Sequence, residues 1–126
     1  NFIGENNRLM GSVESIDGDK ATVKTDSGDI VVASKVNVNK VGDRATLSLR
    51  PERIMVSPSK GKTPNTYSAK VEELIYHGDH IRTRFSVCGH DDFIVKIPNS
   101  IDNVSLKEGK QVDIGWMSED CLALDG

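Results

Sequence analysis

Apolar and polar residues alternate along most of the chain in short runs, as in β-strands that bury one face. The first such run extends from Leu9 to Ile16, and two more follow at 21–25 and 30–33. Turns rich in Gly, Asp and Ser separate the runs, and these residues supply the positive φ and the local hydrogen bonds of tight turns. The pattern predicts three strands joined by short hairpins.

A central stretch from Leu47 to Val56 places two apolar segments on either side of a charged break, Arg50-Pro51-Glu52. Proline fixes its own φ and has no amide proton, so a strand must end there. We expect a strand, a sharp corner and a second strand. Arg50 and Glu52 can tie this corner together or pair with another protein surface. For so short a motif the first role is the commoner one.

A polar stretch without large apolar residues follows this corner. It reads Ser-Pro-Ser-Lys-Gly-Lys-Thr-Pro-Asn over residues 57–65, a composition typical of an exposed connector. Alternation then resumes, and a loop with one helical turn is expected at 99–108. The resulting organisation is an entry segment at 1–8, a first β half at 9–57, a connector at 58–66 and a second β half at 67–126.

The two halves carry the same pattern. Val13-Glu14 corresponds to Val71-Glu72, and the glycine turn at 41–43 corresponds to the turn at 108–110. The offset of the glycine turns also carries Leu47 onto Ile114, Leu49 onto Trp116, Glu52 onto Glu119 and Ile54 onto Cys121. Such self-similarity indicates a repeated supersecondary unit. Short strands in this density, without helices, predict an all-β fold, a small Greek-key barrel of the OB type whose two half-barrels share strands.

Composition narrows the range of functions. The chain has 126 residues, the size of one domain, with 16 Lys and Arg against 19 Asp and Glu and a net charge of −3. No basic block stands out, and Phe85, Phe93 and Trp116 fall on apolar faces where core packing explains them, so nucleic acid is not an expected partner. No apolar run has the length needed to cross a bilayer and no signal peptide is evident, so direct membrane insertion is not expected.

A phosphate-binding loop is excluded by position. Gly61-Lys62-Thr63 looks like the end of such a loop, but the place of its first glycine is taken by Val56, within a strand, and Pro64 follows directly. No ATP site is expected in this sequence.

Neither a metal site nor a catalytic site is predicted. His77 and His80 flank one hairpin turn, while Cys88 and His90 flank another, and one strand length separates the turns by more than a tetrahedral site spans. The acidic residues of the turns are open to solvent, without a tuned acid and base pair. Cys88 and Cys121 are expected as free buried thiols of a reducing cytosol, although a disulfide remains open.

With these pieces in place, the chain resembles the TOBE (transport-associated OB) domain, the C-terminal regulatory segment of ATPases of bacterial ABC importers. The likeness lies in Phe2-Ile3-Gly4-Glu5, Leu49-Arg50-Pro51-Glu52, Tyr76-His77-Gly78, Trp116 and Cys121-Leu122-Ala123-Leu124. The N-terminal segment and the Tyr-x-Gly turn make the spermidine/putrescine branch the most similar.

The resemblance implies a non-catalytic regulatory and dimerisation domain of an ATP-binding subunit. Residues 1–8 would then be the joint from an absent upstream ATPase domain. ATP and Mg would bind in that upstream domain, and no cofactor is implied here. The implied partners are a second ATPase subunit and, for the parent protein, membrane permease subunits, which gives a cytoplasmic location at the inner face of the cell membrane. As interface or structural motif the resemblance offers Arg50, Pro51, Glu52, Tyr76, His77 and Gly78.

A second hypothesis is a small-ligand-binding OB-like module, because related repeats in molybdate systems bind oxyanions at subunit interfaces. Such a site needs donors that hold an anion, and Lys35, Lys40 and Arg44 form the only modest basic cluster in the sequence.

Overall fold

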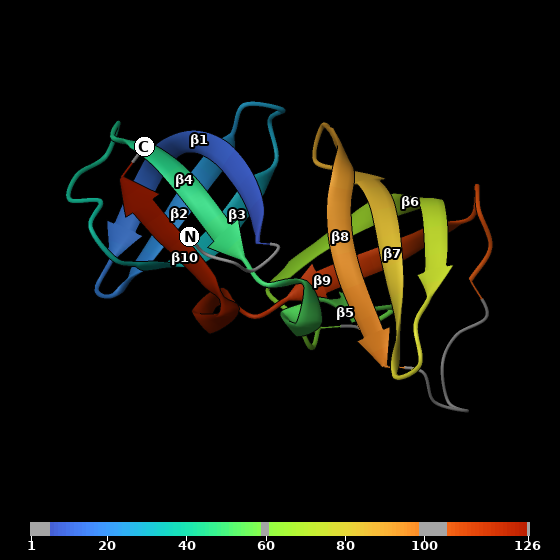
Figure 1. Cartoon of the computed structure of the whole chain (residues 1–126). Coiled ribbons are helices and arrows are strands. Elements are labelled where there is room, and N and C mark those ends of the chain that lie inside the picture. Colours follow the sequence, from blue (N-terminus) through green and yellow to red (C-terminus); the bar gives the residue numbers. More distant parts are fainter. Residues whose placement is uncertain (1–5, 59–60, 99–105, 126) are drawn as a thin grey trace.

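The computed structural model of the chain describes residues 6–58, 61–98 and 106–125. The expected N-terminal motif at 2–5 and most of the expected loop at 99–108 lie outside the described residues. Within them, ten strands form two sheets of five, which Figure 1 shows side by side.

The first sheet is a closed barrel in the order β1-β2-β3-β10-β4. Its strands are β1 (Asn7–Asp17), β2 (Lys20–Thr25), β3 (Ile30–Lys35), β4 (Arg44–Leu49) and β10 (Cys121–Asp125). The second sheet has the order β5-β9-β6-β7-β8. Its strands are β5 (Met55–Val56), β6 (Asn65–Tyr76), β7 (His80–Val87), β8 (His90–Pro98) and β9 (Gln111–Trp116). The prediction of an all-β, OB-like fold is confirmed.

The alternation of residue types becomes an alternation of burial. Along β7 every second residue is buried, beginning at Ile81 and passing through Thr83 and Phe85. Phe85, Phe93 and Trp116 are at most 2% exposed, which confirms their predicted place in the core. One continuous apolar cluster includes buried side chains from both sheets, so the interior of the barrel is connected to the packed face of the second sheet.

Two short 3₁₀ helices mark the places where the chain passes from one sheet to the other. The first, η1 (Pro51–Arg53), lies between β4 of the barrel and β5 of the second sheet. The second, η2 (Ser118–Asp120), lies between β9 of the second sheet and β10 of the barrel. Each half therefore gives its last strand to the other half, which is the sharing of strands that the repeat predicts.

Because of this exchange, the sheets do not follow the sequence division into 9–57 and 67–126 at two points. The strand Met55–Val56 pairs with β9, and Cys121–Asp125 pairs with β4 and, in parallel, with β3. The boundaries of the two halves themselves stay a prediction.

The repeat is visible in the irregularities of the strands as well as in their order. Both long first strands contain a register shift, between Val13 and Ser15 in β1 and between Val71 and Glu73 in β6. The N–H of Gly42 donates to the carbonyl of Val13 at 2.8 Å, and the N–H of the equivalent Gly109 donates to that of Val71 at 2.7 Å. The glycine turns paired in the sequence thus close equivalent bulges.

The second hairpin of the second half differs from the sequence expectation. The sequence places Cys88 before this turn and His90 after it, but β7 ends at Val87 and β8 begins at His90, so the turn consists of Cys88 and Gly89. Both have positive φ, 52° and 80°, as two-residue turns of this kind require. A Cβ at residue 89 would lie 2.8 Å from the Ser27 Cβ of the opposite half. This close approach adds to the need for glycine at this position.

Two buried asparagines fasten each half to the other, and we call them the asparagine clamps. Asn7, at the start of β1, donates from Nδ2 to the carbonyl of Ile94 at 2.7 Å and accepts from the N–H of Ile94 at 2.8 Å. Asn65, at the start of β6, does the same to Val32 at 2.9 and 2.8 Å. A side-chain amide carries a donor and an acceptor together, so each one acts as a short piece of neighbouring strand.

We predict that Asn65→Ala lowers the free energy of unfolding by about 1–3 kcal/mol, because both backbone groups of Val32 lose their partner at a part-buried site. Asn65 is only 1% exposed. Urea denaturation measures the change. The matched control is Asn39→Ala at an exposed position, expected to stay within about 0.5 kcal/mol of the parent. Equal stabilities of the two variants would contradict a structural role of the clamp.

Candidate functional site

The first corner is held by burial and backbone geometry rather than by its charges. Pro51 is buried at the first position of η1, Ile54 beyond it is 5% exposed, and the Arg53 N–H donates to the Arg50 carbonyl at 3.1 Å. The side chains of Arg50 and Glu52 are 66% and 51% exposed, and their nearest nitrogen and oxygen are 3.9 Å apart. So long and exposed an ion pair adds little stability. Both charges therefore remain available to a partner.

The second corner has the same backbone and the opposite charge. Its turn is closed in the same way, by the Asp120 N–H donating to the Met117 carbonyl at 3.1 Å. Ser118 takes the buried place of the proline. Where the first corner carries two arginines and one glutamate, the second carries Glu119 and Asp120 and no basic residue. The two corners therefore share a backbone conformation and differ in the sign of their net charge.

A hollow of about 220 Å³ lies between the two corners. The charged residues that line it are Arg50, Arg53, Glu119 and Asp120, together with Asn6, Ser48 and Leu122. Within the described part of the chain no ion pair joins these two arginines to these two carboxylates. Sequence reasoning did not single out Glu119 and Asp120 as site residues, although the repeat already aligned Glu119 with Glu52.

The third motif, the turn at 76–78, lies elsewhere. It joins β6 to β7 at the lower edge of the second sheet in Figure 1, whereas η1 lies at the junction of the sheets. Tyr76 is 66% exposed, and the His77 ring stacks on His80 with centroids 4.6 Å apart. The His77 N–H donates to the His80 carbonyl at 2.8 Å and closes the turn that contains Gly78. The structure does not bring this motif to the corner, and its role in an interface stays a prediction.

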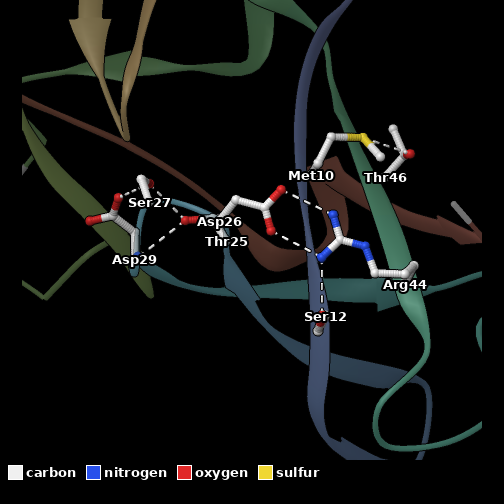
Figure 2. A network of polar contacts seen from close by, with 8 residues as sticks. All are labelled: Met10, Ser12, Thr25, Asp26, Ser27, Asp29, Arg44 and Thr46. Atoms are coloured by element: carbon white, nitrogen blue, oxygen red, sulfur yellow. Dashed lines mark hydrogen bonds and ion pairs between the residues drawn. The ribbon is translucent and has the colours of Figure 1, made fainter.

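The basic cluster considered for oxyanions has its strongest donor engaged. Figure 2 shows the Arg44 guanidinium with both terminal nitrogens on the carboxylate of Asp26, at 2.9 and 3.0 Å, and one of them also donating to the Ser12 hydroxyl at 3.1 Å. The Arg44 hydrogen bond is the main cause that lowers the pKa of Asp26. Among the described residues, no ion pair joins the side chain of Lys35 or Lys40 to a carboxylate, although the charge of Lys40 contributes to the lowered pKa of Asp43.

Both cysteines are free and buried, as the sequence predicts. Burial is the main cause that raises the pKa of each thiol to about 12. A thiol with so high a pKa is protonated at neutral pH and is a poor nucleophile or metal ligand. No group of three or more His, Cys, Asp or Glu that could hold a metal ion occurs among the described residues.

In the described ranges, the chain has no helix of sufficient length and hydropathy to traverse a bilayer.

The doubled β unit and its two corners define an OB-type domain, and comparison with known proteins gives its family. The family model described as the TOBE domain matches residues 47–124. This chain belongs to the TOBE domain family. The matched range begins in β4 and ends in β10, so it includes both corners and the strands that they exchange. The TOBE domain is non-catalytic.

Curated relatives carry this segment at their C-terminal part. The chain is 35% identical over 99 residues to the spermidine/putrescine import ATP-binding protein of Roseobacter denitrificans, covering 79% of this chain and 27% of that protein. It is 28% identical over 127 residues to the protein of the same name from Rubrobacter xylanophilus, covering 99% of this chain and 33% of that protein. The chain thus spans about a third of the length of the curated relatives it matches.

A solved structure shares the fold. It is that of the cytoplasmic molybdate-binding protein ModG with molybdate bound, with a TM-score of 0.82 over 95% of this chain and 96% of that one. Sequence identity is 12%, so the likeness extends to the fold alone.

We predict that Asp26 titrates below its ordinary pKa of 3.8 and that Arg44→Gln moves its midpoint back toward that value. Because the folded pKa is the lower one, the Arg44 contact stabilises the fold above pH 3.8 and is lost as the pH falls through the folded value. Carboxyl chemical shifts followed by NMR measure both midpoints. Asp79, whose pKa is lowered mainly by His80, is the internal control and should not move. An Asp26 midpoint unchanged by Arg44→Gln would contradict the assignment.

Proposed function

We propose that this chain is the non-catalytic regulatory and dimerisation domain of the ATP-binding subunit of an ABC importer. The observation that carries the proposal is its match, over 99% of its own length, to the C-terminal part of import ATP-binding proteins. ATP and Mg bind in the upstream ATPase domain, and this domain holds no cofactor of its own. Its β corners are surface features without catalytic chemistry, which suits a role in contacts.

We infer that the imported solute is a polyamine of the spermidine and putrescine class. The curated relatives from Roseobacter denitrificans and Rubrobacter xylanophilus both carry that name. The solute itself is selected by other subunits of an importer, so no residue of this domain has to contact it.

The expected partners are a second copy of the ATP-binding subunit and the membrane permease subunits on which the parent protein docks. The location is then cytoplasmic, peripheral at the inner face of the cell membrane. The exposed charges of Arg50 and Glu52, set by Pro51, support a contact at the first corner. The exposed Tyr76 and His77 offer a second contact surface around Gly78.

Uptake of labelled spermidine by cells tests the proposal. Deletion of the gene that encodes this chain is expected to reduce spermidine uptake to background and to leave the uptake of an unrelated amino acid unchanged. The intact gene should restore uptake. A gene lacking the codons for residues 6–125 should restore less uptake than the intact gene. Unchanged spermidine uptake in the deletion strain would contradict the polyamine assignment.

The alternative is an oxyanion-binding OB-like module, and the fold shared with ModG is the observation in its favour. Against it, the guanidinium of Arg44 is already engaged by Asp26. Titration calorimetry with molybdate, tungstate and sulfate separates the two functions, and the absence of heat with all three anions would eliminate the alternative.

A further inference from the structure

The two corners present opposite charges that remain unneutralised within the chain. Arg50 and Arg53 of the first corner line the same hollow as Glu119 and Asp120 of the second. Arg50 has only the 3.9 Å contact with Glu52, and no ion pair in the described ranges involves Arg53, Glu119 or Asp120. A basic and an acidic surface thus stand side by side at one place on the molecule.

We propose that two copies of this chain associate face to face through this hollow, with the basic first corner of each copy against the acidic second corner of the other. The inference rests on the proposed function and specifies its self-association surface.

The arrangement fits a two-fold contact. In a two-fold interface the same patch meets itself, so a contact from the first corner to the second is made twice. One copy therefore needs both charges on one patch, and the two corners supply them around a single hollow. Opposite charges placed in this way set the orientation of the partner more than they add raw affinity.

An exposed leucine lies in the same patch. Leu122 of β10 lines the hollow and is 42% exposed, although the neighbouring strand residues Cys121 and Ala123 are fully buried. Protein interfaces commonly have an apolar centre with a polar rim. Leu122 supplies apolar area to the same lining as the four charged side chains.

The charge pattern favours a second copy over other occupants. Nucleic acid and small oxyanions would meet the carboxylates of Glu119 and Asp120, and an organic cation would meet the two arginines. A patch with two positive and two negative residues is complementary to itself when rotated by half a turn.

Sedimentation equilibrium over a wide concentration range, at low ionic strength, tests the proposal with two double variants. R50E/R53E makes both corners acidic, and E119R/D120R makes both corners basic. Each variant alone is expected to raise the dimer dissociation constant roughly tenfold or more, because like charges then face each other twice. An equimolar mixture of the two variants should recover dimers, because every contact in the mixed pair is again between opposite charges.

The matched controls are K24E/K62E and D17R/D19R, which make the same changes of charge at exposed positions elsewhere. They should dimerise like the parent chain, and an unchanged near-ultraviolet signal from the buried Trp116 shows that each variant is folded. If the parent dimerises but the corner variants behave like the controls, or if mixing recovers nothing, this surface is wrong while the uptake result still stands. A parent chain that is monomeric at every concentration overturns self-association of this domain itself.

Discussion

The structure depends on the exchange of last strands between the closed barrel and the second sheet, and the asparagine clamps stabilise that exchange. Asn7 and Asn65 each satisfy a backbone donor and acceptor of the opposite half, at Ile94 and Val32. Both side chains are nearly fully buried, where an unpaired polar group would be costly. The clamps therefore favour one register between the halves, which the non-directional packing of a shared apolar core would specify less sharply.

The two corners follow from the exchange. A chain that passes from one sheet to another must leave a ladder and change direction within a few residues, and η1 and η2 do this with equivalent backbones. A buried Pro51 ends the ladder at the first corner, and Ser118 occupies that place at the second. Because the corners are crossing points, their remaining side chains point outward and can differ in charge without cost to the fold. Contact chemistry can therefore be placed there independently of stability.

Much of the fold was readable in the sequence because its signals are local. The alternation of apolar and polar residues predicted the strands, Pro51 predicted the corner, and the spacing of the glycine turns predicted the repeat. The partner of the last strand was not readable, because pairing of β10 with β4 joins residues far apart in sequence. The clamps had a signal that could have found them: Asn7 precedes Val13 by the same interval as Asn65 precedes Val71. Of the two corners, only the first was predicted as a candidate site. The acidic second corner becomes a candidate only once the fold places it beside the first.

Native-state hydrogen exchange of the Val32 and Ile94 amides, followed by NMR, tests the joined architecture most directly. Each of these N–H groups donates to a clamp asparagine of the other half. If the two halves form one cooperative unit, both amides exchange only through global unfolding, with equal free energies that match urea denaturation. If both amides exchange through a local opening of lower free energy than global unfolding, the clamps open while the fold persists and do not unite the halves.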